Sequence, residues 1–187
     1  MSVSSLRDLY QEQLKDLYNA EQQLIKALPK MAKAANSEDL KAAFEDHLGQ
    51  TKQHAQRIET IFEQMGEKPT GKKCKAMEGL VEEGGEVIDE EMEEGIKDAA
   101  LIAAAQRVEH YEIAGYGCVR AYAERLGDTE AASLLAETLE EEKKADELLN
   151  GIAEGLNLEV PQEDEGESEK RTAGNAKVPG RKTKSAA

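Results

Sequence analysis

Hydrophobic residues recur at helical spacing in four long segments of this chain. In residues 4–35, leucines and other apolar side chains return every three or four positions, which predicts an amphipathic helix. A second helix is expected from a cap at Asn36 or Ser37 to about residue 65. Its inner face advances alternately by four and three residues, through Leu40, Phe44, His47, Thr51, His54, Ile58, Ile61 and Met65.

The second half of the chain repeats this arrangement after a long connection. A third helix is predicted over residues 98–126, ended by Gly127, and a fourth opens at Asp128 or Thr129. Residues 66–98 contain a shorter apolar pattern that glycines interrupt, which indicates a short helix within a crossover. The pattern therefore predicts an all-α four-helix bundle in which each half is an up-down pair, with a shorter helix in the crossover between helices two and three.

Composition narrows the class of protein. Charged residues make up 34% of the chain and the net charge is −15, which argues against specific nucleic-acid binding. No apolar run is long enough for a membrane span, and no signal peptide is evident, so we expect a cytoplasmic protein. Periodicity stops near Pro161, which predicts a helical domain over 1–158 and a disordered charged tail over 159–187.

Each long helix interrupts its apolar face with side chains that can bind metals. A buried, unpaired carboxylate costs several kcal/mol or must protonate, and several at one level cost more. Two divalent cations would neutralise them, and mid-helix positions of antiparallel neighbours meet at one height. The pattern predicts a di-iron or di-manganese site. The candidate ligands are Glu21, then Gln50 and His54 with His47 nearby, Glu109 and Glu112, and Glu142 with Asp146 one turn later.

Each candidate also has a simpler interpretation. Glu21 alone is typical of a surface glutamate beside an apolar stripe, and the two histidines of the second helix fit a core or interface. Which of Glu140, Glu141 and Glu142 points inward depends on a small rotation of the fourth helix. The coincidence of such residues on all four helices favours the metal site.

Three stretches, "KCKAMEGLVEE", "DAALIAAAQRVEHYEIAGYG" and "LLAETLEEEKKAD", resemble the YciF/YciE family of bacterial ferritin-like stress proteins, of the DUF892 type. The resemblance covers about residues 4–155. It implies a ferritin-like bundle with a rubrerythrin-like dinuclear metal site, and a homodimer linked to general stress responses. It places ligands on Glu21, Gln50, Glu109, Glu112 and Glu142, with His54 and Asp146 where the second members of ExxH-like pairs could lie.

One departure from the family falls in the second helix. Relatives tend to have "HLEET" where this chain has "HLGQT", so that Gln50 offers only a neutral carbonyl oxygen. Either His54, together with His47, compensates as a nitrogen ligand, or one metal position is weak or empty.

Two functions follow as hypotheses. In the first, a dinuclear iron or manganese centre reacts with peroxide or oxygen as a rubrerythrin-like peroxidase or oxidase. Tyr111 or Tyr116 would supply an electron or proton, and the reductant would be an external electron donor because no CxxC pair is present. The alternative is a non-enzymatic dimeric helical stress protein with a weak or vestigial metal site. Mineral storage in a large cage ranks last.

Overall fold

The computed structural model describes residues 3–70 and 72–156, which form five helices and no strand. The helices are α1 (Leu6–Ala34), α2 (Glu38–Met65), α3 (Lys75–Asp89), α4 (Glu94–Leu126) and α5 (Thr129–Gly155). These bounds confirm the four long helices and the shorter crossover helix, although α4 begins four residues earlier than expected. The tail predicted over 159–187 lies outside the described residues.

The helix ends follow from the capping residues that the sequence offers. The Ser37 hydroxyl accepts a hydrogen bond from the Leu40 N–H at 3.4 Å, and Asp128 Oδ1 accepts one from the Ala131 N–H at 3.1 Å. Gly127 ends α4 with a left-handed φ of 78°, a conformation that glycine adopts without steric cost. Of the caps left open by the sequence, Ser37 and Asp128 are therefore the ones used.

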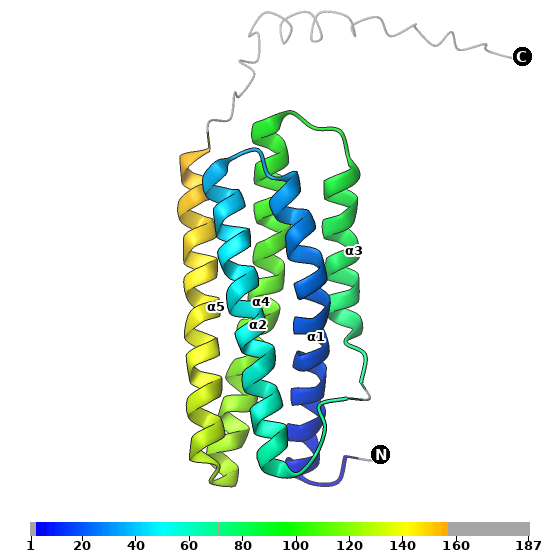
Figure 1. Cartoon of the computed structure of the whole chain (residues 1–187), viewed down its shortest axis with the longest axis vertical. Coiled ribbons are helices and arrows are strands. Elements are labelled where there is room, and N and C mark those ends of the chain that lie inside the picture. The colour runs from blue at the N-terminus through cyan, green and yellow to red at the C-terminus, as the bar shows by residue number, and fades with distance from the viewer. Residues whose placement is uncertain (1–2, 71, 157–187) are drawn as a thin grey trace, which may run out of the picture. The chain divides into compact units, whose positions relative to one another are not determined.

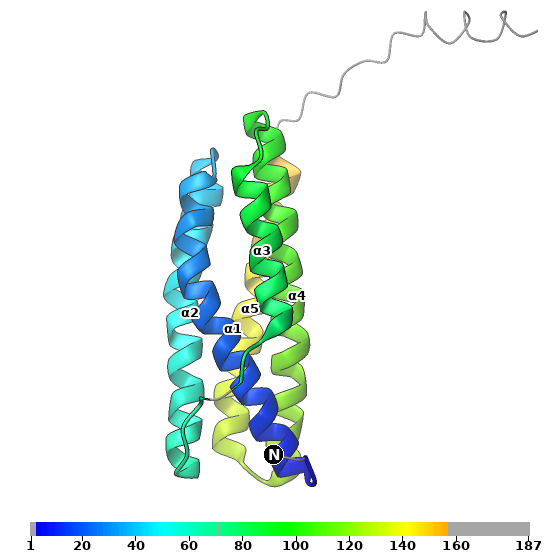
Figure 2. The same cartoon turned by 90° about the vertical axis from the view of Figure 1, so that its right-hand side faces the viewer.

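The four long helices pack as two antiparallel hairpins, α1–α2 and α4–α5 (Figures 1 and 2). The crossover containing α3 carries the chain back along the bundle, so that α4 starts at the end where α1 finishes. As a result α1 packs against α4, α2 packs against α5, and α3 covers the groove between α1 and α4. Within the described residues, no helix is both long and apolar enough to cross a membrane.

The core is divided into two apolar clusters along the bundle axis. One cluster is built around Leu24, Leu28, Phe44 and Leu101, and the other around Leu14, Ile58, Phe62 and Val119. Between them lies a layer of buried polar residues, which we call the inner layer: Glu21, His47, Thr51, His54, Glu109, Glu112, Thr138 and Glu142.

A further buried acid, Asp98, lies outside this layer and has a structural role. Its two carboxylate oxygens accept hydrogen bonds from the backbone N–H groups of Asn36 and Ser37, each at 2.8 Å. Asp98 therefore ties the turn between α1 and α2 to the first turns of α4. Its burial, at 3% exposure, is compensated by charge-assisted hydrogen bonds.

Two glycines of α4 differ in what surrounds them. A Cβ on Gly115 would lie 2.7 Å from Leu17 Cδ2, so this glycine permits close packing of α4 on α1. A Cβ on Gly117 would meet no atom within 4 Å. Only Gly115 is therefore needed for the approach of the two helices.

We expect Gly117→Ala to raise the free energy of unfolding by about 0.5–1 kcal/mol, since alanine is the better helix former and the site has room. Gly115→Ala gains the same propensity but displaces the buried Leu17 side chain, and should be less stable than Gly117→Ala by about 1–2 kcal/mol. Urea unfolding followed by circular dichroism compares the two. Equal stabilisation by both substitutions would contradict this packing.

Candidate metal centre

The inner layer brings together four carboxylates and two imidazoles, contributed by all four long helices. Glu21 comes from α1, His47 and His54 from α2, Glu109 and Glu112 from α4, and Glu142 from α5. The glutamates are at most 3% exposed, and His54 is fully buried. Three-and-four spacing on the inner face of each helix places these side chains at one level of the bundle.

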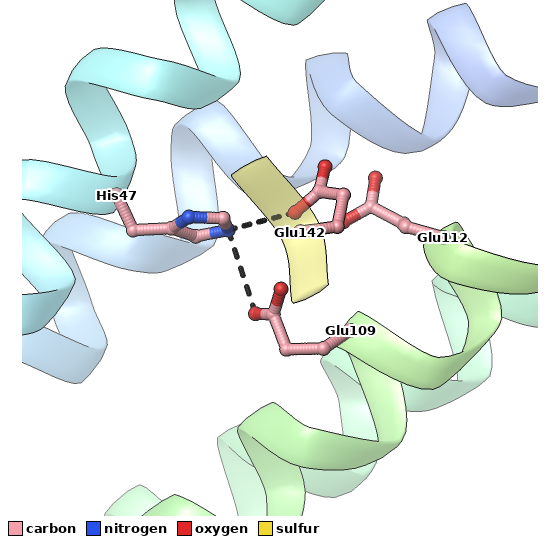
Figure 3. A group of neighbouring side chains, drawn as sticks. All are labelled: His47, Glu109, Glu112 and Glu142. Carbon is pink, nitrogen blue, oxygen red and sulfur yellow. Dashed lines mark ion pairs between the residues drawn. The ribbon is translucent and has the colours of Figure 1, made fainter. Parts of the chain in front are cut away.

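One group of ligand-type residues consists of His47, Glu109, Glu112 and Glu142, whose side chains converge in Figure 3. The Nε2 atom of His47 lies 3.4 Å from Glu109 Oε1 and 3.7 Å from Glu142 Oε2. One ligand atom from each of the four residues falls within 4.8 Å of all the others. This set offers three carboxylates and one imidazole to a single cation.

A second group consists of Glu21, His54 and Glu142, again within 4.8 Å of one another. The Nδ1 atom of His54 lies 2.9 Å from Glu142 Oε1 and 3.7 Å from Glu21 Oε1. Glu142 thus belongs to both groups. A carboxylate shared between two adjacent ligand sets is the arrangement that a pair of cations requires.

Partners outside the layer orient both imidazoles. Gln50 Oε1 lies 3.3 Å from His47 Nδ1, and Glu141 Oε2 lies 2.9 Å from His54 Nε2. Because these oxygens can only accept, the contacts favour a proton on the facing ring nitrogens and leave the inward nitrogens available to a cation. Arg57 neutralises Glu141 through two hydrogen bonds. The imidazoles are therefore held in the form that binds a cation.

The inner layer is short of hydrogen-bond donors. Eight of its buried oxygen and nitrogen atoms have no hydrogen-bond partner among the described residues, including both oxygens of Glu112 and both of Glu142. The contact between His54 and Glu142 is close but lacks hydrogen-bond geometry. Unpaired buried polar atoms are rare in folded proteins. Their concentration here indicates a binding site whose ligand would pair with them.

Burial shifts the acid–base equilibria of these glutamates in the same direction. It raises the pKa of Glu21 to about 8, and it raises the pKa of Glu109 above its usual value. Burial also holds the pKa values of Glu112 and Glu142 well above the ordinary range, with neighbouring carboxylates adding to the effect. Without cations, the layer retains protons at neutral pH.

The two tyrosines named from the sequence lie in different surroundings. Tyr116 is fully buried, and its hydroxyl donates a hydrogen bond to Glu21 Oε1. Its ring centroid lies 6.2 Å from that of His54. Tyr111 instead donates to Asp16 and contacts the Cys74 sulfur at 3.0 Å. Only Tyr116 adjoins the inner layer.

The residues predicted as ligands fall into two sets. Glu21, His54, Glu109, Glu112 and Glu142 meet in the inner layer, together with His47. Asp146 belongs to neither group, and Gln50 contacts His47 from outside the layer.

Geometry explains why these two residues stand apart. Around their helices, position 50 is rotated roughly 60° from His47 and position 146 roughly 40° from Glu142. Gln50 therefore supports His47 from the side, and Asp146 pairs with the exposed His110 at 3.3 Å. Metal binding by any of these residues stays a prediction.

The sequence does not predict the contacts of two residues that support the candidate site. Glu141 and Arg57 form the pair that orients His54, yet each lies off the inner face of its helix. Arg57 follows His54 by three residues, a spacing that puts both side chains on the same side of α2. This spacing indicates that Arg57 lies near His54. It does not reveal the contact with Glu141, which depends on α5 lying beside α2.

Comparison with known proteins gives a family match over most of the chain. The family described as a domain of unknown function, DUF892, matches residues 5–160. Protein YciF of Escherichia coli strain K12 is 47% identical over 154 residues, which cover 82% of this chain and 93% of YciF.

Solved structures agree with this match. The crystal structure of the E. coli stress protein YciF is similar with a TM-score of 0.79, covering 81% of this chain and 96% of that one. YcfI of Rhodopseudomonas palustris is 42% identical with a TM-score of 0.77, covering 80% and 95% of the two chains. Ferritin-like, diiron-carboxylate proteins of Bacillus anthracis strain Ames share the fold at 18% identity and a TM-score of 0.63, over 81% and 99%. These similarities confirm the ferritin-like fold.

We expect the metal-free protein to lose stability as the pH rises from about 4.5 to 8. Folded Glu21 keeps its proton up to a pKa of about 8, whereas the unfolded chain releases it near 4.5, so the folded state holds more protons in this window. The free energy of unfolding should fall by about 1.4 kcal/mol per pH unit for each extra proton held. Chemical unfolding in the presence of a chelator measures this slope.

A variant and a metal-bound sample serve as controls for that slope. Glu112→Gln cannot ionise at its own position and should give a shallower profile. Protein saturated with a divalent cation should lose the decline, since cations favour ionised carboxylates. A flat profile for the chelated protein would contradict the raised pKa values.

Proposed function

Because the chain belongs to the DUF892 family, we propose that it is a ferritin-like stress protein whose inner layer binds two divalent iron or manganese ions and reacts with peroxide or oxygen. The observation that carries this proposal is the inner layer itself: buried, short of hydrogen-bond donors, and divided into two ligand groups that share Glu142. A stress protein and diiron-carboxylate proteins among its structural relatives point the same way.

Charge balance supports a pair of divalent ions. The inner layer contains four carboxylates, and its two imidazoles are oriented to bind as neutral ligands. Two divalent cations would bring the layer to neutrality, whereas one would leave two buried charges unmatched. Mixed carboxylate and imidazole ligands suit iron and manganese alike.

Each group has a defined part in this proposal. His47 and Glu109 would hold one ion, and His54 and Glu21 the other, with Glu142 between them. Glu112 belongs to the first group, and it also lies near the second, since the charge of Glu21 helps to raise the pKa of Glu112. Two adjacent redox metals can exchange electrons with an oxygen–oxygen bond.

The protein groups around the layer would control protons and access. Tyr116 donates a hydrogen bond to Glu21 and remains protonated, because burial raises its pKa well above the usual value. A small cavity of about 140 Å³ reaches His47 and Glu109 from the side of α2 and α5, past Gln50 and Lys144. Its small size suits water or peroxide, and polar side chains stand among the apolar ones that line it.

Three further parts of the proposal concern the setting of the protein. We infer a homodimer, an external electron donor and a cytoplasmic location. They are supported by the family resemblance and by the lack of a CxxC pair in the sequence. Light scattering of the purified protein tests the dimer.

We expect anaerobic titration with ferrous or manganous ions to give two ions per chain. Glu142→Gln should abolish both sites, because both groups use this carboxylate, whereas Glu21→Gln should retain about one ion. Elemental analysis after removal of free metal gives the stoichiometry. Glu140→Gln, at an exposed neighbouring position, is the matched control. Fewer than one ion per chain in the unaltered protein would refute the dinuclear site.

Tyr116→Phe should bind two ions normally but slow the oxidation of the ferrous protein by peroxide at least about tenfold, since it removes the proton donor beside Glu21. Stopped-flow absorbance follows the reaction. Tyr111→Phe is the control, because that hydroxyl contacts Asp16 and Cys74. Equal rates in the two variants would exclude the proposed role of Tyr116.

A further inference from the structure

A second and larger cavity approaches the inner layer from the opposite side of the bundle. It has a volume of about 260 Å³ and lies between α1, α3 and α4. Apolar side chains form most of its wall, among them Leu24, Leu28, Met31, Val81, Ile88 and Val108. Its size exceeds the roughly 150 Å³ of an engineered apolar cavity that holds benzene, and in proportion it accommodates roughly eight to ten carbon atoms.

The deep end of this cavity is polar and reaches the inner layer. His47 and Glu109 line it, and each carries a buried atom without a hydrogen-bond partner: His47 Nε2 and Glu109 Oε2. An apolar cavity that ends on such groups has the build of a small-molecule site, in which a few polar groups meet a mostly hydrophobic wall.

The mouth of the cavity is positively charged. Lys26 and Lys30 line it from α1 and are exposed. Among the described residues, no carboxylate forms an ion pair with either lysine, although the chain has a net charge of −15. A carboxylate would therefore be attracted to the mouth, where the charges of both lysines are unpaired within the described part of the chain.

We propose that this cavity binds a monocarboxylic acid with an unbranched chain of roughly eight carbons. Its carboxylate lies at Lys26 and Lys30, and its apolar chain points inward, toward His47 and Glu109. Binding itself depends only on the cavity. Its meaning as a substrate site rests on the proposed metal centre, because only bound metals would make the deep end reactive.

Glycines in α3 allow a direct test of the cavity. Gly84 is buried in the cavity wall, and a Cβ at this position would lie 3.8 Å from Met31 Sδ, so a larger side chain must extend into the open space. Gly79 lies on the same helix, does not line the cavity, and has nothing within 4 Å of an added Cβ. Leucine at the two positions changes the helix equally but fills the cavity only from position 84.

Calorimetric titration of the full-length, chelator-treated protein with octanoate should give saturable binding of one molecule per chain. Gly84→Leu should weaken this binding by at least about tenfold, and Gly79→Leu should leave it unchanged. Ala105→Leu fills the cavity from α4 and serves as the second variant if Gly84→Leu does not fold. Circular dichroism and melting curves establish the fold of each variant.

The charged mouth is tested separately. Replacing both Lys26 and Lys30 by glutamine should weaken octanoate binding about three- to tenfold while leaving octanol binding unchanged. Lys33→Gln, on the same helix but outside the lining, is the control. Octylammonium should bind more weakly than octanoate.

The orientation of the acid has its own readout. In protein containing Mn²⁺, proton relaxation should be faster at the methyl end of bound octanoate than beside its carboxylate. The reverse order would overturn the orientation. Equal octanoate binding by Gly84→Leu, Ala105→Leu and Gly79→Leu, or no saturable binding at all, would overturn the site.

These outcomes remain separate from those of the metal centre. The calorimetric experiments contain no metal, so a failure to bind Mn²⁺ would refute the proposed function and leave the cavity result standing. Conversely, loss of octanoate binding in Gly84→Leu with two metal ions still bound per chain would show that the cavity and the inner layer act independently in binding.

Discussion

The repulsion among four buried carboxylates is the constraint on which the rest of this structure depends. Asp98 shows how the same fold buries an acid for structural purposes, with two backbone N–H groups on its oxygens. Within residues 3–70 and 72–156, the glutamates of the inner layer have no comparable set of donors, and two of them have no hydrogen-bond partner on either oxygen. Their charge can be neutralised by protonation or by bound cations.

The architecture around the inner layer favours bound cations. Antiparallel hairpins bring mid-helix segments of four helices together, and the two apolar clusters close the layer off at both ends along the bundle axis. Gln50 orients one imidazole, and Glu141, held by Arg57, orients the other. These partners favour a proton on the outward ring nitrogens, so that the inward nitrogens face the carboxyl groups as acceptors. A protonated carboxyl can satisfy such an acceptor, but only a cation would use the carboxylates and both imidazoles together.

The helical period predicted most of the fold and much of the layer. Glu21, His54, Glu109, Glu112 and Glu142 lie on inner faces that the apolar pattern defines, and all five are buried together. Family resemblance and ligand spacing predict Gln50 and Asp146 as ligands, but Gln50 contacts His47 from outside the inner layer and Asp146 pairs with the exposed His110. The roles of Glu141 and Arg57 could not be predicted, because these two residues are 84 positions apart in sequence and lie on different helices. The large cavity depends on how the crossover helix sits on α1 and α4, which no local pattern determines.

The two sides of the inner layer differ in a way that bears on its chemistry. Toward α2 and α5, a small cavity of mixed polar and apolar lining leads to His47 and Glu109; toward α3, a larger and more apolar cavity leads to the same two residues. A site used only to store metal needs one polar entrance. A site that brings a small oxidant and an organic molecule together needs two entrances of different character, because each must exclude the other's ligand. The crossover helix supplies that difference, since its apolar face covers a groove that a bundle of four helices alone would leave open to water.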